Sequence, residues 1–130
     1  MTINIIEDTT MNDFILLFRR DSVSRENQPS PEQMQSSIKP WQDWIGSIAA
    51  QNKLVSSGNR LHNEGKVVKS PTMVTNGPYV EIKESISGYI IVRTKDFDEA
   101  AELAKGCPIL QDPWNGNVEV RMIVPMEPAN

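Results

Sequence analysis

The chain contains one cysteine and one histidine, and each shortage excludes a class of protein. A lone cysteine, Cys107, cannot form an internal disulfide, which fits a reducing compartment, and we interpret it as a small buried apolar residue. One histidine and one cysteine do not make the ligand set of a structural zinc site, so we expect neither a metal nor a cofactor. The N-terminus has no basic region followed by a long apolar stretch. We therefore expect no signal peptide, no membrane span and a cytoplasmic location.

The charge is mixed in sign and slightly acidic. A net charge of −4 argues against a surface that binds phosphates through clustered lysine and arginine, so nucleic acid is not an expected partner. At 130 residues the chain has the usual size of one domain and can bury roughly two-thirds of its unfolded surface. We divide it into an N-terminal extension (1–13), one domain (14–124) and a C-terminal tail (125–130).

The first half of the sequence predicts a buried strand followed by a long helix. Residues 14–18 form a continuous apolar run of strand length, typical of a strand covered on both faces. A helix start is indicated by Ser30-Pro31-Glu32-Gln33, which has a capping serine and a glutamine three residues later. Apolar residues then recur at three- and four-residue steps. This spacing places them in one stripe along a helix and predicts that this helix face lies on a sheet. Its members are Met34, Ile38, Trp41, Ile45, Ile48 and Ala49. Because of Pro40, this region is either one kinked helix or two abutting helices. We expect the helical region to end near Asn52.

The second half predicts a strand, a hairpin, another strand, a helix and a final strand. We expect strands at 54–58 and 89–94, and between them a small hairpin over 60–68, with Gly65 in its middle, extended by 72–75. A helix is expected after Asp96, because a capping aspartate is followed by an acid three residues later. Alternating valines and polar residues over 118–124 indicate a strand with one buried face.

This order predicts an α+β domain of the ferredoxin-like, split βαβ class with an inserted β-hairpin. An antiparallel sheet of this kind carries both helices on one face. The other face would expose Ile15, Leu17, Ile91 and Ile123 to water. We therefore expect a homodimer, in which the uncovered faces of two copies meet.

A turn, a strand and a helix follow one another at fixed spacing in the second half of the chain. They read Asn76-Gly77-Pro78-Tyr79, Glu81, Lys83-Glu84, Gly88-Tyr89 and Asp98-Glu99-Ala100, and Gly106-Cys107-Pro108 and Val118-Glu119-Val120-Arg121 continue the pattern. The hallmark of the YCII-related family, often called DGPF-domain proteins, is this same pattern with Asp-Gly-Pro-Phe as its first four residues. The chain resembles that family over residues 14–124.

The resemblance implies a dimeric α/β barrel, with a cleft beside the hairpin that bears the Gly-Pro turn. Most such proteins have no assigned reaction. Some relatives are presumed enzymes that use a histidine on the first long helix with a nearby aspartate, one branch eliminates chloride from a chlorinated ring-cleavage product, and others accompany sigma factors. Here Trp41 stands at the position of that histidine and Asn76 replaces the hallmark aspartate, so the dyad is missing.

His62 and the Gly-Pro turn are the first candidates for a functional site. His62 lies in an expected loop, where its imidazole is either a proton carrier near neutral pH or simply exposed. The turn at Asn76, Gly77 and Pro78 either fixes the backbone or forms one wall of a ligand cleft, to which Lys83 and Glu84 would add polar contacts.

Arg19 and two tryptophans complete the candidates. Arg19 ends the first strand and could hold an anionic ligand bidentately. Trp41 and Trp44 share a helix face and either pack on the sheet or line its pocket. Glu119 and Arg121 would point outward from the last strand, either solvated or paired between subunits.

Three functions stay open from the sequence. The first is a homodimer that binds a small polar or anionic metabolite in a cleft. The second is a lyase or isomerase that acts on an enolisable acid, with His62 as proton carrier. The third is an interaction module linked to transcription regulation.

Overall fold

The computed structural model describes residues 10–20, 30–77, 85–112 and 114–126. Its elements, in chain order, are β1 (Asn12–Arg20), α1 (Pro31–Ala50), β2 (Leu54–Arg60), β3 (Gly65–Ser70), β4 (Met73–Gly77), β5 (Ser85–Thr94), α2 (Phe97–Ala104), the short 3-10 helix η3 (Pro108–Leu110) and β6 (Asn117–Met122). No helix in these ranges is long and apolar enough to span a bilayer.

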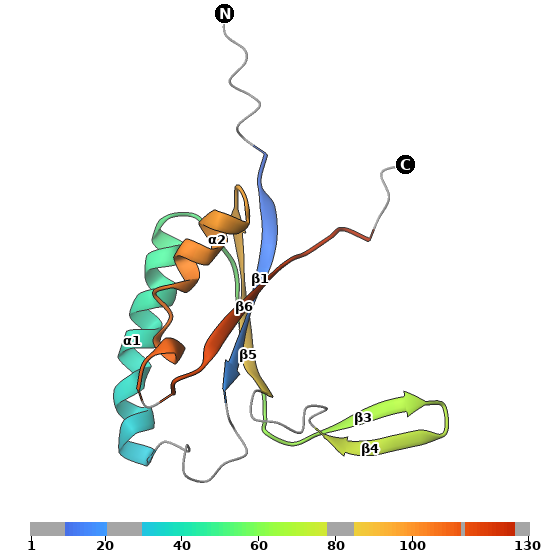
Figure 1. The fold of residues 1–130 in the computed structure, drawn as a ribbon. Coiled ribbons are helices and arrows are strands. Elements are labelled where there is room, and N and C mark those ends of the chain that lie inside the picture. Colours follow the sequence, from blue (N-terminus) through green and yellow to red (C-terminus); the bar gives the residue numbers. More distant parts are fainter. Residues whose placement is uncertain (1–9, 21–29, 78–84, 113, 127–130) are drawn as a thin grey trace, which may run out of the picture.

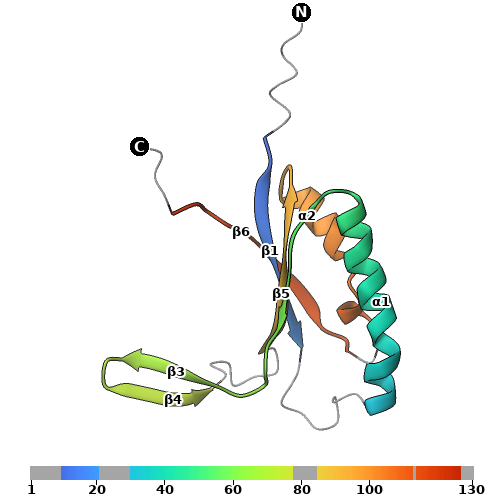
Figure 2. The same ribbon diagram turned by 180° about the vertical axis from the view of Figure 1, so that it is seen from behind.

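The main sheet confirms the ferredoxin-like α+β fold. Its strand order is β2-β5-β1-β6, and every neighbouring pair is antiparallel. Both helices cover the same face of this sheet, and the other face carries no helix in the described part of the chain (Figures 1 and 2). The chain thus forms two layers, as the order of predicted elements requires.

The alternation of side chains along β1 separates a buried face from an open face. Phe14, Leu16 and Phe18 are buried on the helix side. Ile15 and Leu17 point the other way and are only partly buried. Within one chain the strand is therefore covered on one face, and the apolar side chains of the open face lack a cover made by the described residues.

Local capping explains where both helices begin. Ser30 and Gln33 form a reciprocal capping box at the start of α1, with hydrogen bonds of 2.8 and 3.1 Å. Pro40 lies inside α1 and the helix continues through it, which settles the alternatives of one or two helices in favour of one. After its last turn Asn52 adopts a left-handed φ of 62°, as expected for that position. Asp96 caps α2 by accepting a hydrogen bond from the backbone N–H of Glu99.

Trp44 connects α1 to α2 and to the core. Its indole Nε1 donates a 2.9 Å hydrogen bond to the carbonyl oxygen of Leu103, and its ring meets Phe18 edge to face with centroids 5.9 Å apart. A buried indole is stable only when its N–H has a partner, so this bond fixes where the second half of α1 lies. Trp44 and Ile48 are the buried residues of α1.

The inserted hairpin lies later in the chain than expected. Gly65 begins β3 instead of forming the turn, and the strands β3 and β4 are joined through residues 71–72. They form a separate two-stranded sheet that projects from the side of the main sheet opposite the helices (Figures 1 and 2). The prediction over 60–68 was wrong because glycine, which marks many turns, stands here at a strand end.

Gly58 gives β2 a backbone conformation that other residues rarely adopt. Its φ is +66°, and a Cβ atom at this position would lie 1.6 Å from the carbonyl oxygen of Tyr89 on β5. The pairing of β2 with β5 shifts register between Ser56 and Asn59, around this glycine. Gly58 therefore allows a bulge that brings the end of β2 back into register with β5.

Gly58→Ala is expected to destabilise the protein by roughly 1–3 kcal/mol or more, because it adds left-handed strain to a clash with backbone. Urea unfolding followed by far-UV circular dichroism measures the difference in the free energy of unfolding. Gly46→Ala is the matched control, since Gly46 lies in α1 with nothing within 4 Å of its missing Cβ, and should raise stability by up to about 1 kcal/mol. Equal effects of the two substitutions would contradict the bulge.

Candidate ligand pocket

The first half of α1 faces a pocket instead of a packed core. Both buried residues of the helix, Trp44 and Ile48, lie in its second half. Ile38, in the first half, is 46% exposed although it belongs to the apolar stripe. The space between this half of α1 and the ends of β2 and β5 is a pocket of about 470 Å³. That volume falls within the range of about 300–1,000 Å³ typical of small-molecule sites.

The walls of the pocket are mainly apolar. Aromatic and aliphatic side chains come from α1, from the sheet and from the segment after α2: Met34, Ile38, Trp41, Ile45, Phe18, Ile90, Ile109, Leu61 and Trp114. Trp41 is held in place by edge-to-face contacts with Phe18 and Trp44, with ring centroids 5.1 and 5.8 Å apart. Polar side chains at the edge come from Ser37, Gln42, Ser57 and Ser87.

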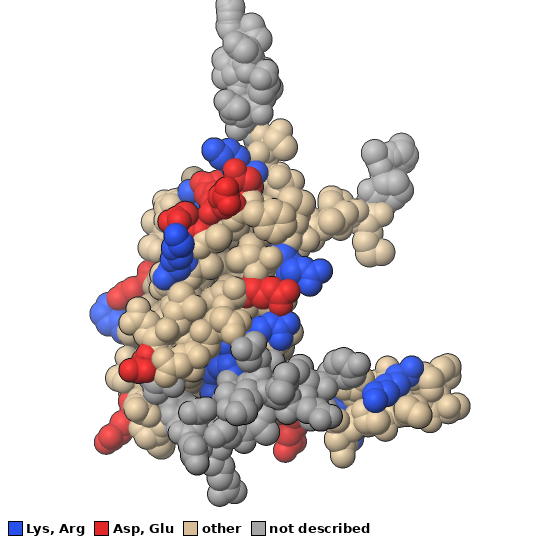
Figure 3. All heavy atoms as spheres, in the orientation of Figure 1, with Lys and Arg blue, Asp and Glu red and all other residues tan. Residues whose placement is uncertain are grey.

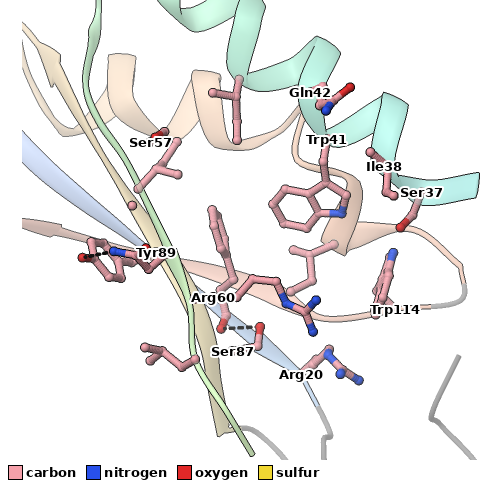
Figure 4. A pocket seen from close by; sticks show the side chains of 18 of the residues that line it. Arg20, Ser37, Ile38, Trp41, Gln42, Ser57, Arg60, Ser87, Tyr89 and Trp114 are labelled. Carbon is pink, nitrogen blue, oxygen red and sulfur yellow. Dashed lines mark hydrogen bonds between the residues drawn. The ribbon is translucent and has the colours of Figure 1, made fainter. Parts of the chain in front are cut away.

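Two arginines supply the charge of this pocket. The Arg20 side chain is buried, and its guanidinium carbon lies 5.0 Å from the centroid of the Trp114 ring. Arg60 is exposed, and none of the residues that the structure describes forms a hydrogen bond or an ion pair with its guanidinium. Figure 4 shows both guanidinium groups on the same side of the pocket as Trp114, below the ring of Trp41. The described lining contains no aspartate or glutamate.

Strand geometry explains why both arginines reach this pocket. Arg60 lies opposite Gly88 on β5, which has no side chain to compete for the space. A second bulge lies where β1 and β5 shift register, and Ser87 is the extra residue, whose hydroxyl donates a 3.2 Å hydrogen bond to the carbonyl of Phe18. Bulges redirect side chains near strand ends, as in β2 before Arg60, whereas Arg20 follows the regular inward alternation of β1.

Of the residues predicted from sequence, Trp41 lines this pocket and Arg19 does not. Arg19 points to the open face, where its Nη2 lies 2.8 Å from Oε1 of Glu119. The hydrogen bond from Arg19 lowers the pKa of the Glu119 carboxyl, against a small opposing effect of burial, and Arg121 adds to the lowering. Glu119 is thus paired within its own chain, with Arg121 at 3.4 Å as a second partner.

The residues of the Gly-Pro turn lie outside the described pocket or outside the described residues. Asn76 is on β4, where its side-chain oxygen accepts a 2.8 Å hydrogen bond from Lys66 of β3, and Gly77 ends that strand. Neither lines the pocket. Pro78, Lys83 and Glu84 lie outside the described residues, so their predicted contacts stay predictions.

His62 is exposed in the segment between β2 and β3. Its Nδ1 accepts a 3.0 Å hydrogen bond from the backbone N–H of Glu64, and it is absent from the pocket lining, although the preceding Leu61 is part of that lining. A catalytic role for His62 stays a prediction. The described residues contain no group of three or more histidine, cysteine, aspartate or glutamate side chains placed to hold a metal ion.

Cys107 is buried in the core, as expected. Burial raises the pKa of its thiol to about 12, so it carries almost no thiolate at neutral pH. The thiol pKa is higher in the folded chain than in the unfolded chain, so the protonated thiol favours the folded state. This contribution to stability is present below about pH 8.5 and is lost as the pH rises through the pKa of the folded chain. Cys107 is therefore a packing residue and not a nucleophile.

Sequence reasoning missed Arg20, Arg60 and Trp114. Arg20 continues the inward alternation of Phe14, Leu16 and Phe18, and that period of two could have identified it. Arg60 had no such signal, because the bulges in β2 break the alternation that would have placed its side chain. Trp114 stands in a loop, where no periodicity applies.

The chain matches the model of a known protein family. The sequence profile of the YCII-related domain matches residues 24–127, which is more than half of the chain. The match begins after β1 and includes every later element of the fold. A search of curated proteins found no match.

Proposed function

Because the chain belongs to the YCII-related domain family, we propose that it is a homodimer that binds a small organic anion in the pocket between α1 and the ends of β2 and β5. The observation that carries this proposal is Arg60, which enters a mainly apolar pocket whose described lining has no acid. The cytoplasmic location expected from the sequence stays a prediction.

Arginine is suited to this task for a physical reason. A guanidinium presents several N–H groups in one plane and binds a carboxylate or phosphate bidentately. Such a bond gains strength in a partly water-free pocket. Arg60 has no protein partner among the described residues, so a ligand anion would not have to displace one. Arg20, whose guanidinium lies over the Trp114 ring, lines the same end of the pocket and already has partners within the protein.

The Arg60→Gln variant is expected to lose about tenfold or more in affinity for organic anions, since a hydrogen bond to a charged group contributes about 1.5–3 kcal/mol. Thermal unfolding in the presence of a panel of carboxylates and phosphates measures this, because a ligand that binds the folded state raises the midpoint. Lys39→Gln is the matched control. It removes one positive charge from α1, where Lys39 is 80% exposed and pairs with Asp43.

Two outcomes of that panel would contradict the proposal. One is a panel in which no anion raises the unfolding midpoint of the native chain. The other is a bound anion whose affinity falls equally in Arg60→Gln and Lys39→Gln, which would show general attraction by net charge and no specific contact with Arg60.

Catalysis is less well supported than binding. A lyase or isomerase needs a proton carrier at the substrate, and the described lining contains no histidine, aspartate, glutamate, lysine or cysteine. Tyr89 is the remaining titratable residue of the lining apart from the two arginines, but its hydroxyl lies near the side-chain amide of Asn59, 3.4 Å away, and points away from Trp41 (Figure 4). No observation favours an interaction module in transcription regulation.

The open face of the sheet supports the homodimer. Ile15, Leu17 and Ile91 stand on it, flanked by the ion pairs of Arg19 with Glu119 and Arg93 with Asp13. Figure 3 shows charged side chains of both signs next to one another at this edge of the molecule. An apolar centre with a mixed polar rim is the composition of protein interfaces, and a second copy offers the same surface in a two-fold arrangement.

Ile91→Lys is expected to convert the dimer into a monomer, because it places a charge at the centre of the open face. Sedimentation equilibrium gives the mass, and circular dichroism confirms that the variant is folded. Leu110→Lys is the control, since Leu110 is 40% exposed on η3, away from the open face. A native chain that sediments as a single copy at high concentration would refute the dimer.

A further inference from the structure

We infer that the ligand of this pocket carries a flat aromatic ring beside its anionic group, so that the ring lies against Trp41 while the anion meets Arg60. This inference rests on the proposed function and adds the chemical class of the ligand. Three features of the pocket support it.

The first feature is an apolar surface that the fold covers only in part. The stripe of α1 is continuous in sequence, but Met34, Ile38 and Trp41 line the pocket, whereas Ile48 is buried in the core. Ile38 remains 46% exposed, and Trp41 is only partly buried. A purely polar metabolite would leave this surface unused, whereas a ligand with an apolar body would remove it from water.

The second feature is the rigidity of the aromatic walls. Trp41 is fixed by Phe18 and Trp44, whose rings meet it at interplanar angles of 74° and 79°. Trp114 is fixed on one side by the guanidinium of Arg20. Rigid rings favour a rigid flat partner, since stacking adds to apolar contact and a ring loses less conformational freedom on binding than a flexible chain.

The third feature is the closeness of charge and aromatic surface. Arg60 extends from β2 into the space between Trp41, on α1, and Arg20 with Trp114 on the far side (Figure 4). An anion bound by Arg60 therefore has an aromatic wall next to it. A ligand that places a carboxylate directly on a ring satisfies both contacts with one small molecule.

Nuclear magnetic resonance of the three tryptophan indoles tests this inference on the intact chain, which contains only Trp41, Trp44 and Trp114. Benzoate is the probe, and cyclohexanecarboxylate is its match, with the same charge and carbon count but no flat ring. We expect benzoate to shift the indole signals of Trp41 and Trp114 and to bind roughly two- to tenfold more tightly than cyclohexanecarboxylate. The Trp44 signal should stay in place, because that indole donates to Leu103 and lies outside the pocket lining.

Substitutions separate this inference from the proposed function. Trp41→Phe and Trp114→Phe assign the signals, and Trp41→Leu should remove the preference for benzoate while leaving binding of cyclohexanecarboxylate. Glutarate serves as a flexible acid without a ring. If cyclohexanecarboxylate or glutarate binds as tightly as benzoate, and Arg60→Gln weakens the binding of all of them, the aromatic ligand is refuted and the anion site stands. If neither a carboxylate nor a phosphate shifts Trp41 or Trp114, or if Arg60→Gln leaves benzoate affinity unchanged, both proposals are overturned. Unfolding midpoints of the variants show which of them are folded.

Discussion

The hydrogen bond from the Trp44 indole to the carbonyl of Leu103 fixes how α1 lies on the sheet, and the pocket is a consequence. This bond joins the second half of α1 to the end of α2, 59 residues later in the chain. Before Trp44 the same helix extends over the ends of β2 and β5, where bulges interrupt the strand pairing. The helix therefore packs tightly at one end and leaves an apolar hollow at the other.

The period of two in β1 sends neighbouring arginines to opposite sides of the sheet. Arg19 pairs with Glu119 on the open face, while Arg20 is buried on the helix side against Trp114. The proposed dimer contact and the proposed ligand site thus lie on different faces of one layer. Because the described pocket is formed by a single chain, ligand binding and dimerisation can be tested separately.

Much of the fold could be predicted because it depends on local signals. The capping residues Ser30 and Asp96 and the inward alternation of β1 act over a few residues, and they gave the right helices and the right sheet class. The hairpin was misplaced because glycine is permissive both in turns and at strand ends. The site was harder. Trp41 follows from the helical stripe, but the direction of Arg60 depends on the left-handed backbone of Gly58, which no sequence period reveals.

The central claim is that Arg60 and Trp41 form one ligand site. A crystal structure of the chain grown with benzoate tests it most directly. We expect electron density for the carboxylate within hydrogen-bonding distance of the Arg60 guanidinium, with the ring against Trp41. Density beside Arg19 on the open face, with the pocket occupied by water alone, would contradict it.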